Sequence, residues 1–201
     1  MKAFVNSLSI FRIVAAFAII PTLMYQWYWI TFILYTLAAF SDLFDGILAK
    51  KYHVSSKLGG VLDHIGDKLL VANSMIMLAI IFHVWFVIIP VILMIARDLY
   101  VSGLREFMGT QKIEMPVTSP RMSMAKIKTF LQMVSVGAFF LLFAIGTFVT
   151  PQMTMESAGK LFIFSLLILP KIGFWGLWIS LGASLWSGFM YTITFAKKFK
   201  K

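Results

Sequence analysis

Six long apolar segments constrain this chain more than any other feature of its sequence. A helix needs roughly 20 predominantly apolar residues to cross the hydrocarbon core of a bilayer. Segments of that length occupy residues 8–25, 28–50, 60–82, 85–107, 124–149 and 172–196. The chain is 60% apolar and 13% charged, whereas soluble domains are about 45–50% apolar and about 25% charged. We therefore expect one all-α membrane domain over residues 1–201, with six transmembrane helices.

The positions of the basic residues predict the orientation of these helices. The chain has 18 Lys and Arg against 8 Asp and Glu, and with a cytoplasmic N-terminus only Lys160 and Lys171 lie on the outer side. Because cytoplasmic loops are enriched in Lys and Arg, we expect both termini on the cytoplasmic side of the membrane. We expect this membrane to be the inner or cell membrane of a bacterium. Anionic lipid headgroups explain the net charge of +10 better than nucleic acid does. The short apolar stretch at 161–169 either lies at the outer interface or lengthens the last hairpin.

Four of the eight acidic residues lie in one stretch of the sequence, at the cytoplasmic ends of two predicted helices. Asp42 and Asp45 are three residues apart, and Asp63 and Asp67 are four apart, so each pair occupies one helix face. The connection between the two helices is short, so we expect antiparallel neighbours whose carboxylate pairs face each other. A carboxylate at bilayer depth costs roughly 2.5–3.5 kcal/mol, so four together indicate a compensating ligand.

The chemistry of this cluster favours a hard divalent cation. Four carboxylates supply only oxygen ligands, which suit Mg²⁺ or Mn²⁺, bound singly or as a pair. The chain has no cysteine, and its three histidines have no partner at metal-ligand spacing. A cation-transport pathway is the alternative, because acidic residues in spans also mark ion routes. All four aspartates lie at the cytoplasmic end, however, which favours catalysis at the inner surface of the membrane.

The residues from Asp42 to Asp67 resemble the motif of the CDP-alcohol phosphotransferases, D-x-x-D-G-x-x-A-R, eight residues, G, three residues, D, three residues, D. Every spacing fits and seven of the eight specified residues match, with Lys50 in place of the usual Arg. Asn6–Arg12 is similar to the N-x-L-[TS]-x-x-R opening of the first span in this family. Residues 96–106 and 125–129 resemble segments of one branch, the phosphatidylglycerophosphate synthases.

The resemblance implies a reaction and a set of roles. The reaction is transfer of a phosphatidyl group from CDP-diacylglycerol to sn-glycerol 3-phosphate with release of CMP, by a homodimer; serine or inositol phosphate are alternative acceptors. The implied metal ligands are Asp42, Asp45, Asp63 and Asp67. The implied residues of the CMP pocket are Asp42, Gly46, Ala49, Lys50 and Gly59. Asp67 is also the implied general base, a division of roles that the spacing by itself leaves open.

An acceptor phosphate requires fixed positive charge. Arg97 and Arg105 are eight residues apart, about 80° around a helix, so they share one broad face. Arg97 lies well inside its span and is the stronger candidate, and its neighbour Asp98, about 100° away, is expected to be a poor exclusive partner. Lys126 and Lys128 point to nearly opposite sides of a helix, so at most one of them should face the site, and we favour Lys126 over Lys128.

Overall fold

The structure is a computed structural model that describes residues 2–52, 57–110, 120–148 and 159–199. The described residues form six α-helices and no strand. Side chains are described at 7–41, 59–110, 127–148, 159 and 162–197. The helices are α1 (Lys2–Met24), α2 (Tyr28–Tyr52), α3 (Lys57–Phe82), α4 (Trp85–Thr110), α5 (Pro120–Gly146) and α6 (Lys160–Phe199). The predicted all-α membrane fold is confirmed, and each predicted segment corresponds to one helix.

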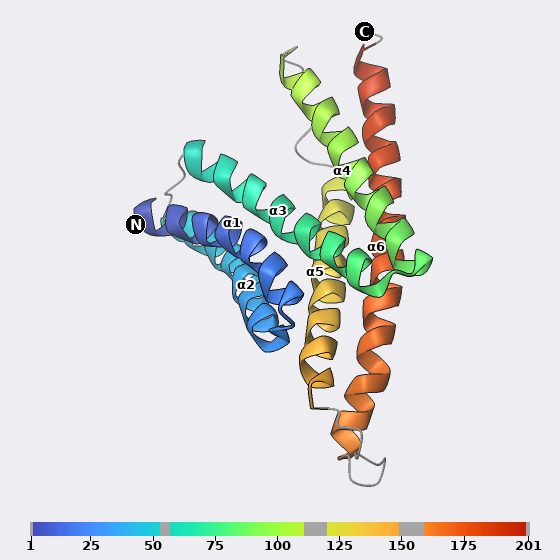
Figure 1. Ribbon diagram of the computed structural model, residues 1–201. Coiled ribbons are helices and arrows are strands. Elements are labelled where there is room, and N and C mark those ends of the chain that lie inside the picture. The colour runs from blue at the N-terminus through green and yellow to red at the C-terminus, as the bar shows by residue number, and fades with distance from the viewer. Residues whose placement is uncertain (1, 53–56, 111–119, 149–158, 200–201) are drawn as a thin grey trace.

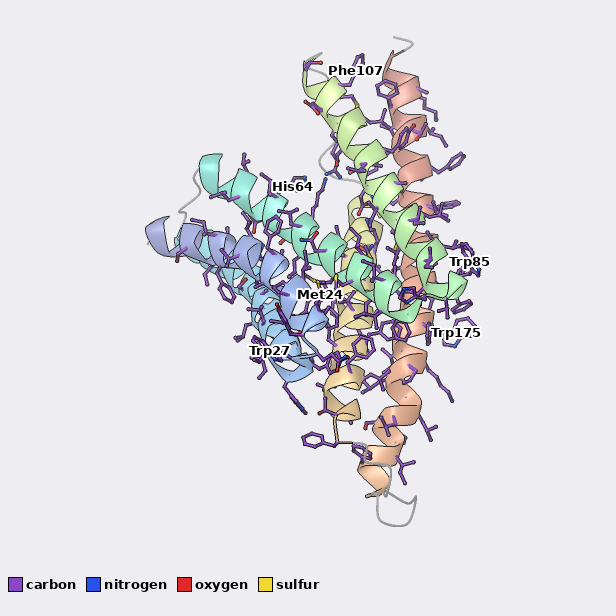
Figure 2. The ribbon with its side chains drawn as sticks, viewed as in Figure 1. Met24, Trp27, His64, Trp85, Phe107 and Trp175 are labelled. Atoms are coloured by element: carbon purple, nitrogen blue, oxygen red, sulfur yellow. The ribbon has the colours of Figure 1, made fainter. Side chains whose placement is uncertain are left out.

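The helices have the length and hydropathy that a bilayer requires. Five of them contain an apolar window long enough to cross it, and in α2 the described apolar part, Tyr28–Ser41, is shorter. Large apolar side chains such as Met24, Trp85 and Trp175 are exposed on the outside of the bundle, where lipid solvates them (Figure 2). The chain is therefore an integral membrane protein.

The last helix is longer than expected. The apolar stretch at 161–169 continues through Pro170 into the final span, so it lengthens the last hairpin and does not form a separate interfacial segment. A proline can be tolerated inside a membrane helix because neighbouring groups satisfy the backbone carbonyl that it leaves unpaired. The 40 residues of α6 span about 60 Å, against about 30 Å of hydrocarbon, so the helix extends beyond the bilayer core.

The order of the helices in space corrects one expectation. Figure 1 shows α1, α2 and α3 as one group, beside a second group made by α4, α5 and α6. Helix α1 packs extensively against both α2 and α3, whereas α2 and α3 make only a small contact with each other. The predicted contact between α2 and α3 therefore exists but is small, because both helices pack mainly against α1.

The second group is joined by close packing of α5 and α6. A Cβ atom at Gly173 would lie 2.5 Å from Cζ of Phe139, and one at Gly176 would lie 2.1 Å from Oγ of Ser135. Phe139 is fully buried, and its ring contacts those of Phe82 and Phe174 at centroid distances of 4.8 and 5.0 Å. In lipid, small residues at helix interfaces allow this approach and the dispersion energy that comes with it.

Replacing Gly173 with alanine is expected to lower the free energy of unfolding by about 1–3 kcal/mol, because the buried Phe139 ring cannot move aside freely. The matched control is Gly182→Ala on the same helix, where a Cβ atom meets nothing within 4 Å. Thermal unfolding of the purified protein in detergent measures both. Equal midpoints for the two variants would contradict the packing described here.

Candidate active site

A buried arginine organises one pair of the predicted carboxylates. Arg12 of α1 has no exposed surface, and its Nη1 donates to Oδ1 of Asp63 at 2.8 Å and to Oδ1 of Asp67. Its Nε donates to Oγ of Ser41 on α2 at 3.4 Å. The four-residue spacing of the two aspartates does place them on one face of α3, as predicted. The guanidinium thus links α1, α2 and α3 at this end of the bundle.

Arg12 has no predicted role, although it is the last residue of the Asn6–Arg12 motif. Four carboxylates were expected to need a bound ligand as compensation, whereas part of the compensation comes from this side chain. The signal that could have identified it is an arginine inside an apolar span, because a charge at that depth requires a partner. The aspartates are the obvious partners within the same half of the membrane.

The second carboxylate pair belongs to α2, but its side chains lie outside the described residues. The same holds for most of the predicted CMP pocket, namely Asp42, Gly46, Ala49 and Lys50, whose backbone is helical. Gly59 is described and lies in the first turn of α3. The nucleotide pocket therefore stays a prediction, supported by the placement of its backbone on helices next to α1.

The described part of the predicted metal site fits a hard cation in its chemistry. Among residues with described side chains, no group of three His, Cys, Asp or Glu is placed to hold a metal ion. Asp63 and Asp67 contribute two carboxylates, whose side chains are 42% and 31% exposed. Carboxylate oxygens are the ligands that Mg²⁺ and Mn²⁺ prefer. These two residues could supply half of the predicted ligand set, and Asp42 and Asp45 would have to supply the rest.

A cavity of about 260 Å³ opens between α3, α4 and α5, next to the Arg12 contacts. Its lining includes Asp67, which also binds Arg12, so the carboxylate pair and the cavity are parts of one site. Four cations line it, here called the basic cluster: Lys68, Arg97, Arg105 and Lys128. The acidic residues in the lining are Asp67 and Asp98. An anion entering this cavity would therefore meet an excess of positive charge.

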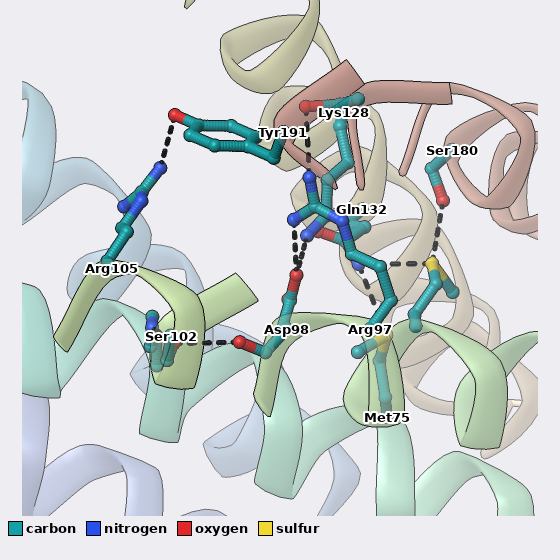
Figure 3. Close-up of polar contacts among 12 residues, drawn as sticks. Met75, Arg97, Asp98, Ser102, Arg105, Lys128, Gln132, Ser180 and Tyr191 are labelled. Atoms are coloured by element: carbon teal, nitrogen blue, oxygen red, sulfur yellow. Dashed lines mark hydrogen bonds and ion pairs between the residues drawn. The ribbon is translucent and has the colours of Figure 1, made fainter. Parts of the chain in front are cut away.

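Asp98 connects the basic cluster (Figure 3). Its Oδ1 accepts a hydrogen bond from Nη1 of Arg97 at 2.8 Å and another from Nζ of Lys128. Its backbone oxygen accepts from Oγ of Ser102 at 2.7 Å, and Ser102 in turn accepts from Nζ of Lys68. Asp98 does bind Arg97, because the long arginine side chain bends back toward its sequence neighbour, but it is not an exclusive partner, as expected, since it also binds Lys128. Asp98 is shared, so it neutralises neither cation alone.

The remaining predicted cations have different outcomes. Arg105 is exposed and donates from Nη2 to the hydroxyl of Tyr191 on α6 at 2.7 Å. Lys128, the alternative to Lys126, lines the cavity and is 5% exposed. The side chain of Lys126 lies outside the described residues, so its predicted role remains a prediction. Lys68 also lines the cavity.

Comparison with known proteins gives a consistent picture. Residues 3–186 match the family model of CDP-alcohol phosphatidyltransferase. The chain is 31% identical over 134 residues to the CDP-diacylglycerol–glycerol-3-phosphate 3-phosphatidyltransferase of Blochmanniella floridana, which covers 65% of this chain and 70% of that protein. It is 43% identical over 109 residues to the protein of that name from Rickettsia bellii, covering 54% of this chain and 57% of the relative. The relative from Salmonella typhimurium is 33% identical over 133 residues, 65% of this chain and 72% of its own length.

Replacing Arg12 with methionine is expected to destabilise the protein by about 2–4 kcal/mol, because removal of one partner leaves the other charges uncompensated. The expected destabilisation is smaller than that for a fully buried ion pair, because Asp63 and Asp67 are partly exposed. Arg12→Lys keeps the charge but not the forked donor, so its unfolding midpoint should lie between those of the wild type and of Arg12→Met. Thermal unfolding in detergent measures the series, with Lys171→Ala at an exposed position of α6 as control. An Arg12→Met midpoint equal to that of the control would refute the structural role.

Proposed function

Because the chain belongs to the CDP-alcohol phosphatidyltransferase family, we propose that it transfers the phosphatidyl group of CDP-diacylglycerol to sn-glycerol 3-phosphate. A hydroxyl of the acceptor forms a bond to the phosphorus that carries the diacylglycerol, and the bond from that phosphorus to CMP breaks. The observation that carries the proposal is the single cavity shared by Asp67 and the basic cluster. It offers a proton acceptor beside a site for an anionic co-substrate, which is the pairing that this reaction needs.

The donor half of the proposed site is built on the carboxylates. A divalent cation, Mg²⁺ or Mn²⁺, held by Asp42, Asp45, Asp63 and Asp67 would offset the charge of the pyrophosphate and of departing CMP. Asp67 would accept the proton of the attacking hydroxyl, since it is the carboxylate that also lines the acceptor cavity. Arg12 holds one oxygen of Asp67 and so orients the carboxylate. The predicted nucleotide residues of α2 and Gly59 would bind CMP.

The acceptor half is built on the basic cluster. A phosphate dianion that leaves water must gain charged hydrogen bonds in return, and preset cations supply them. Arg97 is held from two sides, and Lys128 is almost fully buried, so both present their charge in a fixed place. Arg105 and the predicted Lys126 would add charge at the edge. An inositol phosphate would satisfy the same cations, whereas serine would leave them without a phosphate.

The surroundings of the site follow from the same proposal. We propose that the whole chain is one catalytic domain with both termini and the active site on the cytoplasmic side, in a bacterial cell membrane. The diacyl chains of the donor would stay in lipid, while the acceptor arrives from water. We also propose a homodimer, as the family resemblance implies. A cation transporter is disfavoured, because the described cavity carries an excess of basic residues.

The acceptor assignment is tested by a panel of acceptors with purified protein, CDP-diacylglycerol and Mg²⁺ or Mn²⁺, with the lipid product and CMP as readouts. We expect product with sn-glycerol 3-phosphate and none with serine. Arg97→Ala should raise the KM for glycerol 3-phosphate by roughly tenfold or more, since hydrogen bonds to charged groups contribute about 1.5–3 kcal/mol. The KM for CDP-diacylglycerol should stay nearly unchanged. Efficient use of serine, or an unaltered acceptor KM in Arg97→Ala, would overturn the assignment.

The role of Asp67 has a separate test. Asp67→Asn should lower kcat by roughly 10²–10⁴-fold, the usual contribution of a general base, while CDP-diacylglycerol binds almost as before. The measurements are kcat and the dissociation constant of the donor lipid, with Asp63→Asn for comparison. Equal losses of nucleotide affinity and of rate in Asp67→Asn would assign this residue to metal binding alone.

A further inference from the structure

We infer that the cytoplasmic half of α6 positions the two arginines of the basic cluster through Ser187, Gly188 and Tyr191. The inference rests on the function proposed above and adds a part of the protein that neither the motif nor the cavity includes. None of these three residues lines the cavity, so each would act through an arginine that does. They also lie just beyond residue 186, where the match to the family model ends.

The first contact is the close approach of Arg97 to the backbone of α6. A Cβ atom at Gly188 would lie 3.1 Å from Nε of Arg97 and 3.2 Å from its Cγ. Gly188 is buried, and Nε is buried without a hydrogen-bond partner among the described residues. The stem of the arginine therefore lies closely against the backbone of α6 at this glycine. A methyl group there would have to displace the arginine stem by a few tenths of an ångström.

The second contact fixes the direction of the guanidinium. Nη2 of Arg97 donates to Oγ of Ser187 at 2.9 Å, while Nη1 donates to Asp98 at 2.8 Å. Ser187 is 2% exposed, so no water competes freely for its hydroxyl. One end of the fork is thus held by α4 and the other by α6. This arrangement limits the rotation of the guanidinium and presets its charge at the cavity wall.

The third contact concerns Arg105. Its Nη2 donates to the hydroxyl of Tyr191 at 2.7 Å, and its Cζ lies 4.9 Å from the centroid of the tyrosine ring. Tyr191 follows Ser187 by four residues and Gly188 by three, so all three share one face of α6. This face runs beside α4, which carries both arginines (Figure 3). One helix surface therefore restrains two cations that are eight residues apart in the sequence.

Restraint of this kind affects binding of the acceptor more than binding of the donor. A free arginine has many rotamers, and ordering it on phosphate binding costs affinity; a side chain already held in place avoids most of that cost. The donor's predicted ligands lie on α2 and α3, and Arg12 of α1 donates hydrogen bonds to two of them, Asp63 and Asp67. Loss of the α6 contacts should therefore raise the KM for the acceptor and leave the KM for CDP-diacylglycerol nearly unchanged.

The experiment compares matched substitutions in the full-length protein in detergent. Gly188→Ala is paired with Gly182→Ala, where a Cβ atom meets nothing within 4 Å. Ser187→Ala is paired with Ser184→Ala, whose buried hydroxyl has no partner among the described residues. Tyr191→Phe is paired with Tyr100→Phe, which removes a hydrogen bond between α4 and α6, to Thr192, that involves no arginine.

We expect Gly188→Ala and Ser187→Ala to raise the KM for sn-glycerol 3-phosphate by roughly tenfold over their controls, and to weaken its binding in calorimetric titrations without donor by a similar factor. Tyr191→Phe keeps the ring and should have a smaller effect than Tyr191→Leu. The KM for CDP-diacylglycerol and the unfolding midpoint should match those of the control variants.

The outcomes separate this inference from the function on which it rests. A wild-type protein that makes no product with glycerol 3-phosphate overturns the proposed function, and the inference with it. A wild-type protein that uses glycerol 3-phosphate, with variants that match their controls, overturns the inference alone. Equal increases in both KM values, or a lowered unfolding midpoint, would show that these residues only maintain the packing of α6, and would also overturn it.

Discussion

The rest of the site depends on one buried charge interaction, the contact of Arg12 with Asp63 and Asp67. A charge within a bilayer has no water to solvate it, so its position is decided by the partners that the fold can bring to it. Here the partners lie on α3 and, through Ser41, on α2. Helix α1 is therefore held between α2 and α3, and the two aspartates turn toward Arg12. Both carboxylates stay partly exposed, and Asp67 also lines the cavity.

The charges of the site are divided between two regions that meet at Asp67. Carboxylates and Arg12 occupy the α1–α3 group, while the basic cluster extends from Lys68 on α3 to α4 and α5. A reaction between a nucleotide-activated lipid and a phosphorylated acceptor brings together two anionic substrates, which repel each other. The proposed cation site on the carboxylates and the fixed cations of the basic cluster would give each substrate its own source of positive charge. Asp67 is the residue that both regions share.

The length of the apolar segments was sufficient to predict the helices, and helical spacing was sufficient to predict that Asp63 and Asp67 share one face of α3. Both features depend on local geometry. They also identified Arg97 as a cation of the site. They could not place α1 between α2 and α3, since that depends on which helix surfaces fit together. They favoured Lys126 over Lys128, and they missed the contact of Arg97 with Asp98, for a related reason. The angle around a helix predicts where a Cβ atom points, whereas a long side chain carries its charge well away from that direction.

The close packing at two glycines of α6 also affects contacts that lie farther along the same helix. Gly173 and Gly176 lie so close to Phe139 and Ser135 that a larger residue would not fit at either position. A continuous helix is stiff to torsion, so its orientation about its own axis at these glycines also determines which face it presents at Ser187 and Tyr191. Steric fit in one half of the membrane thereby sets the angular register of contacts to Arg97 and Arg105 near the opposite surface.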